Sequence, residues 1–555
     1  MIKTVNHQSH WTKHLIAAGI ITAFTLLVFG RSLSIGYLAD DYQEFAVIEG
    51  TNYSPFSASG QGIYFRPLKM LSLQVGQIFG PENATFYQHV INIILHIFND
   101  ILIFSILHIL TGQWLFALGV SLFFLVHPAN VTDVYWIAAR VDSILALFYL
   151  AGLLGFIMFL RSGAKGWIGV SILGMAGNLL TKEAGVTLVA VLLITFFFIR
   201  EWGIPKFRVF GLKMKWAIAT LGFQVLLTLS YLVYILVRFY VPTGWKPGTD
   251  ITHVLTALLA YPLLLILPNN QNSLIRIYKI YPFLFWVMLG LFAFIAVVVM
   301  IFMIRKLSRK SILQIIALIA LVCIPVLPMA IMIGGMNSRR LYLPIAMLCV
   351  GIGFWVLVKP RIGRYLVLPI YSLTVVAAII SYSQGSLWVQ NWQATQTACQ
   401  DFREIAAGEP VDTQIIVLTF PRGAKEIPIY GGNLNYALYF CLNQRFGRSD
   451  NIVSVTGLLT DDGTFLPGTV ALTQPQPEVF EITIQQGNAF LYPYPSDACA
   501  GDIYSNSIAS ETVLAIRDDA RVTSVRLDFY DPGILSKNIL IYFDGSTFKR
   551  IKPPD

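Results

Sequence analysis

The feature that most constrains this chain is a succession of long apolar stretches. A helix that crosses a bilayer needs about 20 predominantly apolar residues. Such stretches lie near 15–38, 87–110, 113–126, 134–160, 166–181, 184–200, 216–239, 281–304, 311–333, 341–358 and 364–385. Only 12% of the 555 residues are charged, whereas a soluble protein carries about 25%. The sequence therefore predicts a polytopic α-helical membrane protein with about eleven transmembrane helices.

The loop charges predict how this chain is oriented. Basic residues cluster in short loops, and cytoplasmic loops of membrane proteins are enriched in lysine and arginine. The clusters are Lys3/Lys13, Arg161/Lys165, Arg200 to Lys215, Arg305 to Lys310 and Lys359/Arg361/Arg364. All of them fall on one side if the N-terminus is cytoplasmic and the short apolar run 253–267 does not cross. We therefore expect 240–280 to be an outer loop with a re-entrant or surface-lying helix.

The first apolar stretch indicates whether a signal peptide is cleaved, and the cysteines indicate the redox compartment. The first stretch is followed by GRSLSIG, which lacks an A-x-A-like cleavage site, so we expect an uncleaved first helix. The cysteines show no metal-binding spacing such as C-x-x-C. Three of them, Cys399, Cys441 and Cys499, lie in the tail, where one disulfide can form if that tail is outside the cytoplasm. The sequence leaves the pairing open.

The character of the chain changes after residue 386, where charged residues, proline and glycine become more frequent. Residues 388–407 have the pattern of an amphipathic helix near the membrane, and 434–446 that of a second helix. Strand-like runs occur at 413–420, 477–485, 510–516, 522–530 and 538–543. We therefore expect a transmembrane domain at 1–385 and an extracytoplasmic, soluble α+β domain at 386–555.

An acidic pair, Asp40 and Asp41, follows the first apolar stretch in the sequence YLADDY. A charge near the centre of a bilayer costs roughly 2.5–3.5 kcal/mol, so the pair must lie at an interface or face water. Two interpretations remain. The pair marks the end of the membrane, or it is a pair of catalytic carboxylates at the membrane surface.

Other polar residues are predicted on the same outer side as this pair. Carboxylates suit proton abstraction or cation binding, and arginines bind phosphate in a bidentate manner. Each residue also has a structural interpretation, such as an interface anchor for Arg66 and Arg340, an ion pair for Lys182 and Glu183, or a helix cap for Asp133. The residues are Arg66, His127, Asp133, Arg140, Asp142, Lys182, Glu183, Arg339 and Arg340. Together they suggest a phosphate-bearing lipid substrate and a reaction that needs a base.

One apolar stretch carries a polar stripe. His89, Asn92, His96 and Asn99 recur at i, i+3, i+7 and i+10, which places them on one face of a helix. Polar stripes in membrane helices mostly form hydrogen bonds between helices. We favour that interpretation over a metal site, because two histidines seven positions apart are too distant for one ion.

Six motifs in a fixed order carry a family resemblance. They are YLADDY, YFRPLKMLSLQVGQIFG, FYQHVINIILHIFND, HPANVTDVYWIAARVDSILALFYL, LLTKEAGVTLVAVLL and SRRLYLP. The set resembles the GT-C superfamily of integral-membrane glycosyltransferases, and most closely the tetratricopeptide-containing protein O-mannosyltransferases and their bacterial relatives. Ser338 stands where that family tends to carry an acidic residue, and the α+β domain replaces the tetratricopeptide tail.

The resemblance implies inverting transfer of a sugar from a polyprenyl-phosphate donor to an acceptor hydroxyl of a protein, glycan or lipid. It implies that Asp40 and Asp41 are catalytic, with Asp40 favoured as the general base. It implies a substrate-binding role for residues in the matching motifs: Arg66, His127, Asp133, Arg140, Lys182, Glu183, Arg339 and Arg340. The sequence leaves open whether a divalent cation takes part.

Two other classes of function compete with this hypothesis. A transporter or flippase for the same lipid would favour internal repeats and discontinuous helices, and no such repeat is visible in the sequence. A membrane-anchored binding protein would act through its tail. No nucleic-acid partner is expected, because the basic residues sit in short loops between apolar stretches. In a prokaryote the protein would lie in the plasma membrane, with the active site on the non-cytoplasmic side.

Overall fold

The computed structural model describes most of the chain. The described residues are 7–49, 54–56, 65–80, 84–202, 211–240, 265, 283, 286–287, 290–291, 308–328, 338–407, 409–410, 413–424, 427–428, 437, 441, 452–460, 466–485, 489–492, 494, 498–506, 508–517, 521–531 and 534–551. They form two compact units. Residues 1–33 and 51–385 belong to the first, here called the helical unit, and residues 34–50 and 386–555 belong to the second, here called the β-rich unit.

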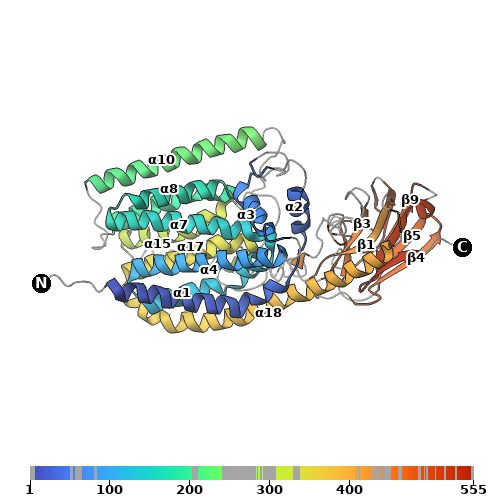
Figure 1. Cartoon of the computed structure of the whole chain (residues 1–555), viewed down its shortest axis with the longest axis horizontal. Coiled ribbons are helices and arrows are strands. Elements are labelled where there is room, and N and C mark those ends of the chain that lie inside the picture. Colours follow the sequence, from blue (N-terminus) through green and yellow to red (C-terminus); the bar gives the residue numbers. More distant parts are fainter. Residues whose placement is uncertain are drawn as a thin grey trace. The chain divides into compact units, whose positions relative to one another are not determined.

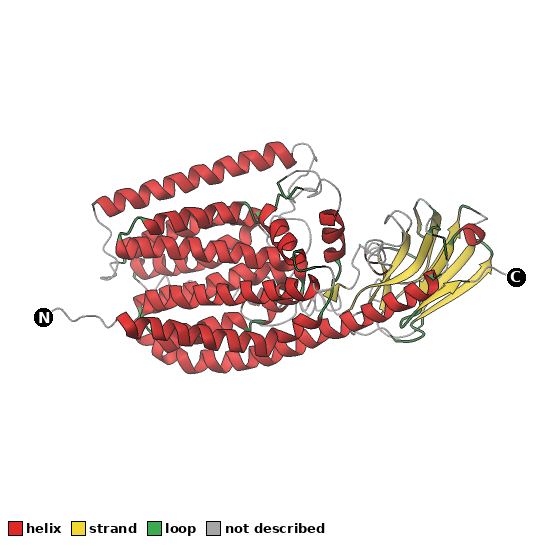
Figure 2. Ribbon diagram, in the orientation of Figure 1, coloured by secondary structure: helices red, strands yellow, loops and turns green. Residues whose placement is uncertain are grey.

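The helical unit is a bundle of apolar helices (Figures 1 and 2). Its longer helices are α1 (His7–Phe29), α3 (Pro67–Gln77), α4 (Ala84–Thr111), α5 (Trp114–Leu125), α7 (Arg140–Ser162), α8 (Gly166–Leu179), α9 (Leu188–Glu201), α10 (Leu212–Ile235), α15 (Arg309–Cys323), α17 (Tyr342–Val358) and the first part of α18 (Pro360–Ala406). Helix α4 packs against α1, α5, α7 and α17, so its polar stripe lies in the centre of the bundle.

The helices confirm the predicted fold class of a polytopic membrane protein. Within the described residues, seven helices are long and apolar enough to cross a membrane, or eight if α5 and the bent segment after it form one span. Helices α8 and α17 are also apolar but shorter. The predicted stretch 281–304 and the run 253–267 lie almost entirely outside the described residues. A total of eleven crossings therefore stays a prediction.

Helix α18 differs from the expectation of two separate segments, one at 364–385 and one at 388–407. It is a single helix of 47 residues, from Pro360 to Ala406. The physical reason is that positions 386–406 contain neither glycine nor proline, so nothing in this part of the sequence ends the helix. Residues up to Gly385 belong to the helical unit and those from Ser386 to the β-rich unit.

Basic residues lie at one end of the helical unit, where several helices begin or end. The indole nitrogen of Trp114 donates a hydrogen bond to the carbonyl of Lys13 at 3.1 Å. The ammonium group of Lys213 donates to the carbonyl of Leu160 at 3.2 Å. We call this the basic end.

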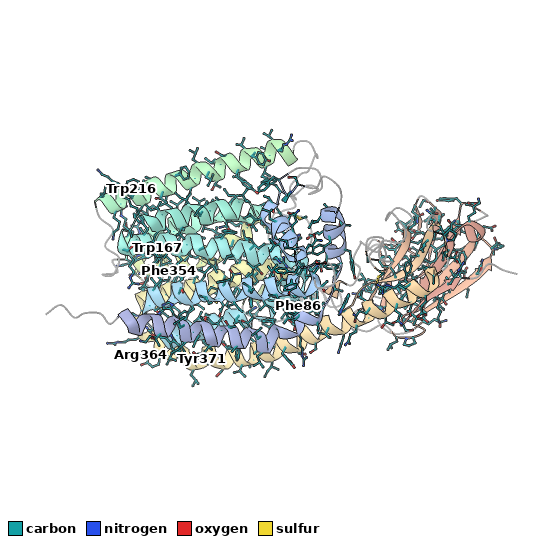
Figure 3. The ribbon with its side chains drawn as sticks, in the orientation of Figure 1. Phe86, Trp167, Trp216, Phe354, Arg364 and Tyr371 are labelled. Atoms are coloured by element: carbon teal, nitrogen blue, oxygen red, sulfur yellow. A yellow bond between two sulfur atoms is a disulfide. The ribbon has the colours of Figure 1, made fainter. Side chains whose placement is uncertain are left out.

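Figure 3 shows both ends of the helical unit. Trp167, Trp216 and Arg364 lie at the basic end. Phe86, near the start of α4, lies at the opposite end. The ammonium of Lys165 is 4.5 Å from the centre of the Trp216 ring. The predicted clustering of basic loops is therefore visible as one chemically distinct end of the bundle.

The β-rich unit contains two sheets (Figure 2). Its strands are β1 (Ile415–Ala424), β2 (Ile427–Pro428), β3 (Ile452–Thr460), β4 (Val470–Gln476), β5 (Val479–Ile484), β6 (Ala489–Tyr492), β7 (Ile503–Ser505), β8 (Ala509–Ile516), β9 (Val522–Phe529), β10 (Ile539–Phe543) and β11 (Phe548–Ile551). One sheet has the order β11-β10-β1-β3-β6, with β2 paired to β1, and the other has the order β4-β5-β9-β8-β7.

The pairing of the strands differs between the two sheets, and it brings apolar residues together. In the first sheet β1 pairs in parallel with both β10 and β3, so that Ile415 faces Ile539 and Ile452. In the second sheet all described pairings are antiparallel. The five predicted strand runs correspond to β1, β5, β8, β9 and β10, which confirms the predicted α+β character. The predicted helix 434–446 lies outside the described residues except at positions 437 and 441.

The loop that carries the acidic pair belongs to the β-rich unit, although we expected 34–50 within the domain 1–385. Gly36 explains part of this grouping, because a Cβ atom there would lie 2.2 Å from the Trp392 ring of α18. Tyr42, on α2 (Asp40–Glu49), is buried in the same apolar cluster as Phe402. Close backbone approach at glycine and burial of an aromatic ring thus attach this loop to residues far away in the sequence.

The tail also contains the disulfide that the sequence left open. Cys399 on α18 is bonded to Cys441, with their Cα atoms 5.3 Å apart. Cys499 is exposed and takes no part in this disulfide.

Candidate active site

Arg66 and the Lys182-Glu183 turn meet at the end of the helical unit opposite the basic end. Arg66 directly precedes α3, whose first residue is Pro67, a favourable start for a helix. The amide of Leu68 donates to the carbonyl of Leu180 at 3.1 Å, which joins the start of α3 to the end of α8. The Arg66 guanidinium is thereby held 3.1 Å from the Glu183 carboxylate, and both side chains are less than one-fifth exposed.

Lys182 forms a second, more deeply buried ion pair. Its ammonium lies 2.5 Å from the carboxylate of Asp142, near the start of α7. The side chains are 7% and 2% exposed. The two adjacent residues of the turn thus have different partners, so the structural alternative of a local ion pair between Lys182 and Glu183 is wrong. A buried pair of this kind is very sensitive to the loss of one member.

Arg140, at the first position of α7, is completely buried. Its guanidinium donates to the side-chain oxygen of Asn92 at 2.6 Å and to the carbonyls of Ser72 and Gln88 at 2.9 and 2.6 Å. These three acceptors come from α3 and α4. Arg140 therefore connects three helices through neutral acceptors, which is the geometry of a residue that positions the site.

The break after α5 carries His127 and Asp133. His127 caps the short helix that follows it, because its Nδ1 accepts from the amide of Ala129 at 3.3 Å. Asp133 is 1% exposed and lies on α6 (Val131–Tyr135). The side-chain amide of Asn92 donates to the carbonyls of Val134 and Trp136, at 3.2 and 3.3 Å. The same asparagine therefore binds both Arg140 and this break.

The segment Ser338–Leu341, which contains Arg339 and Arg340, packs against α6 and against the short helix Pro128–Asn130. The side chain of Arg340 is half-buried. The side chain of Arg339 lies outside the described residues.

The polar stripe of α4 forms the predicted hydrogen bonds between helices. The two ring nitrogens of His96 lie 2.7 Å from the Tyr342 hydroxyl and 2.9 Å from the Leu125 carbonyl. Asn99 donates to the Ser143 carbonyl at 2.9 Å and to the Tyr342 hydroxyl at 3.1 Å. These contacts connect α4 to α5, α7 and α17, and they confirm the hydrogen-bonding interpretation. Among the described side chains, no group of three or more histidines, cysteines or carboxylates is arranged to hold a metal ion.

Asp40 and Asp41 begin α2 in the β-rich unit, and their environments differ. Asp41 is 1% exposed, and its Oδ2 accepts from the amide of Leu38 at 3.0 Å. In return, the Asp41 amide donates to the Leu38 carbonyl at 3.0 Å. Ala39, between them, has a φ of +48°, a backbone conformation that is rare for residues other than glycine. Asp41 therefore fixes a tight turn, whereas Asp40 is half-buried at its edge.

Lys69 is a residue that the analysis of the sequence missed. It lies on α3, three positions after Arg66, and is 7% exposed. Its spacing from Arg66 is the signal in the sequence, because residues three apart are neighbours on a helix. Gln88, whose carbonyl binds Arg140, has no such signal, and Asn92 was predicted only as a member of the polar stripe of α4. Their part in the site depends on the packing of α3, α4 and α7.

Comparisons with known proteins give limited but consistent matches. No protein-family model matches the chain. It is similar to protein O-mannosyl-transferase TMTC2 of Homo sapiens, with 33% identity over 138 residues, or 24% of this chain and 16% of that protein. It is similar to TMTC4 of Homo sapiens, with 26% identity over 147 residues (23% and 20%), and to TMTC4 of Mus musculus, with 25% over 212 residues (31% and 28%). The chain thus matches less than a third of each relative's length.

Among solved structures, the chain is similar to ArnT from Cupriavidus metallidurans bound to undecaprenyl phosphate. The TM-score is 0.43 and the identity 13%, covering 80% of this chain and 92% of that chain. For the apo state of the same protein the TM-score is 0.42 and the identity 13%, covering 82% and 93%. The sequence matches to protein O-mannosyl-transferases agree with the resemblance seen in the sequence, and the chain resembles the GT-C superfamily of integral-membrane glycosyltransferases.

Proposed function

We propose that this protein transfers a sugar from a polyprenyl-phosphate donor to an acceptor hydroxyl. The observation that carries the proposal is the group of cationic and acidic side chains at one end of an apolar helix bundle. Three basic side chains are largely buried there, those of Arg66, Lys69 and Lys182. The carboxylates of Glu183 and Asp142 are largely buried beside them. Apolar helices suit a prenyl chain, and cations at their end suit a phosphate at the membrane surface. Similarity to three protein O-mannosyl-transferases points in the same direction.

In the proposed reaction, the acceptor oxygen attacks the anomeric carbon of the sugar from the side opposite the phosphate, which inverts its configuration. The bond between sugar and phosphate breaks, and its electron pair leaves with the phosphate. Asp40 takes the proton of the acceptor hydroxyl as the new bond forms. The phosphate leaves as an anion and needs no proton, so a single base is sufficient. This distinguishes the reaction from that of a glycosidase, which uses two catalytic carboxyl groups.

The roles of the remaining residues follow from their contacts. Asp41 already binds the Leu38 amide, so it anchors the turn on which Asp40 lies. Arg140 and Asn92 position the helices around the site. Arg66, Lys182, Arg339 and Arg340 are the proposed ligands of the donor phosphate, and Lys69 joins them. His127, Asp133 and Glu183 complete the proposed substrate-binding residues.

Turnover of the donor separates this proposal from its rivals. Purified protein with a panel of polyprenyl-phosphate sugars should release polyprenyl phosphate and form a glycosylated acceptor, as measured by mass spectrometry. Donor binding without any release would contradict the proposal and favour a flippase or a binding protein. The panel would also identify the sugar.

We further propose that the basic end faces the cytoplasm, as the positive-inside rule predicts. The side chain of Gln113 donates to the carbonyl of Pro360 at 2.9 Å, which places the start of α18 beside the start of α5. Residues after α18 are then non-cytoplasmic. The disulfide between Cys399 and Cys441 agrees with this orientation, because disulfides persist mainly outside the cytoplasm.

Labelling with a membrane-impermeant thiol reagent tests this orientation. Native Cys499 is exposed and should react in intact cells. A cysteine introduced by Lys165→Cys in a Cys499→Ser background should react only after permeabilisation, because Lys165 is exposed at the basic end. The opposite pattern at the two positions would reverse the proposed sidedness.

Donor binding tests the phosphate ligands. Arg66→Ala, Lys182→Ala, Arg339→Ala and Arg340→Ala remove charges proposed to bind the phosphate. Since a hydrogen bond to a charged group contributes about 1.5–3 kcal/mol, loss of a true ligand should weaken donor binding roughly tenfold or more. Arg364→Ala is the matched control, because Arg364 is exposed at the basic end (Figure 3). Parental affinity in all four variants would place the phosphate elsewhere.

A further inference from the structure

One face of the second half of α18 is buried in the β-rich unit, to which the acidic loop also belongs. Its residues recur at helical spacing, and each is at most 1% exposed: Thr395, Ala398, Phe402 and Ala406. The last three lie in the apolar cluster that also contains Tyr42, on α2. The helix that begins with the acidic pair therefore packs into the same core as α18.

The residues on either side of Asp40 are almost completely buried. Leu38, Ala39 and Asp41 are each 1% exposed, and Tyr42 is 4% exposed. Asp40 itself is half-buried. Because its neighbours are fixed by packing, the position of the Asp40 carboxylate is set by whatever holds the backbone of this loop.

Trp392 of α18 holds the loop at its beginning. A Cβ atom added at Gly36 would lie within 2.8 Å of three carbons of the Trp392 ring, whereas carbon atoms in contact are about 3.5–4.0 Å apart. Gly36 is not one of the described glycines with a positive φ, so its backbone conformation would accept alanine. The indole ring, and not the backbone, is therefore what excludes a side chain at position 36.

The loop is thus fixed at two points, with Asp40 between them. Gly36 lies against the Trp392 ring, and Tyr42 lies in the apolar cluster. Between these points Ala39 has a φ of +48°. Such a conformation is unfavourable for a residue with a side chain, and it persists only where the surrounding structure enforces it. The two contacts supply that constraint.

We propose that Trp392 is a positioning residue for sugar transfer, because its ring against Gly36 sets where the Asp40 carboxylate lies. This inference rests on the proposed role of Asp40 as the general base. A catalytic group must be held within about 0.5 Å of its productive position, and a displacement of about 1 Å can lower the rate about 10²-fold. The proposed phosphate ligands belong to the helical unit, so a change at Trp392 should affect the chemical step and not donor binding.

Two single variants and their combination test the proposal in the full-length protein. Gly36→Ala forces the ring or the loop to move by roughly 1 Å, and Trp392→Leu removes the ring. Each should lower kcat about 10- to 100-fold while the donor affinity stays parental. If both act through one contact, the double variant should fall no further than the weaker single variant, whereas independent effects would multiply. Gln393→Ala, at the adjacent exposed position of α18, is the matched control and should keep the parental kcat.

Hydrogen–deuterium exchange of residues 36–45 gives a second measurement that does not depend on turnover. Exchange in this segment should be faster in Gly36→Ala and Trp392→Leu than in the parent and in Gln393→Ala. Parental exchange in Trp392→Leu would overturn the proposal. So would a parental kcat of its folded fraction, with or without a lower melting temperature, because Trp392 would then be structural only. Absence of turnover in the parent itself would instead overturn the proposed function, and with it the role of Asp40.

Discussion

Replacing Asp40 by asparagine is expected to lower sugar transfer at least about 10²-fold, the usual contribution of a general base. The amide has nearly the same shape as the carboxylate but cannot take the proton of the acceptor hydroxyl. An alcohol is far too weak an acid for a carboxylate to ionise it in advance, so the base acts as the bond to phosphate breaks. Donor binding, measured separately, should stay at the parental level.

Asp41→Asn is the matched control for this change, because it alters the neighbouring residue of the same turn. An asparagine oxygen can still accept the hydrogen bond from the Leu38 amide that Asp41 now accepts at 3.0 Å. The turn should therefore persist, and transfer should fall less than in Asp40→Asn. Nearly parental turnover in both variants would return the acidic pair to its other interpretation, a marker of the membrane boundary.

Replacing Lys182 by methionine is expected to destabilise the helical unit by about 3–5 kcal/mol, because it leaves a buried carboxylate without its charge partner. Asp142 is 2% exposed and lies 2.5 Å from the Lys182 ammonium. The free energy of unfolding, or the melting temperature in detergent, measures this loss. Lys165→Met, at an exposed position of the basic end, should leave the stability nearly unchanged.

The double variant Lys182→Met/Asp142→Leu separates a structural role of Lys182 from a role in substrate binding. It removes both charges, and replacement of a buried ion pair by apolar residues is often neutral or stabilising. Stability should therefore return. If Lys182 is also a phosphate ligand, donor binding should stay weak in the double variant although its stability is restored. Full recovery of both properties would make the pair purely structural and remove Lys182 from the proposed ligands.

Most of the membrane fold could be predicted because its signals are local. Each stretch such as 87–110 or 134–160 is long and apolar by itself, and α4 and α7 fall where expected. The polar stripe that contains His96 and Asn99 predicted hydrogen bonds between helices, because residues at this spacing lie on one face of a helix. Five strands of the tail were predictable from their apolar, β-branched runs. The short strands β2, β6, β7 and β11 were not predicted, because each has only two to four residues. Strands β3 and β4, with nine and seven residues, were missed as well.

The candidate site was predictable as a set of residues but not as a set of partners. The order of the motifs singles out Arg66, Lys182 and Glu183. It does not show that Lys182 binds Asp142, which is 40 positions away, while Glu183 binds Arg66, which is 117 positions away. Adjacent residues of a tight turn point in different directions, so their partners depend on the helices that pack on each side.

The sequence by itself determined which segments are apolar enough for a membrane, where the basic loops lie and by which motifs the chain resembles membrane glycosyltransferases. These properties depend on composition and short-range spacing, which folding does not alter. Only the tertiary structure decided that the acidic loop joins the β-rich unit and that Cys399 pairs with Cys441. Such contacts join residues far apart in the chain. Their formation is decided by the packing of whole helices and sheets, because a side chain finds its partner only after the backbone has brought both into reach.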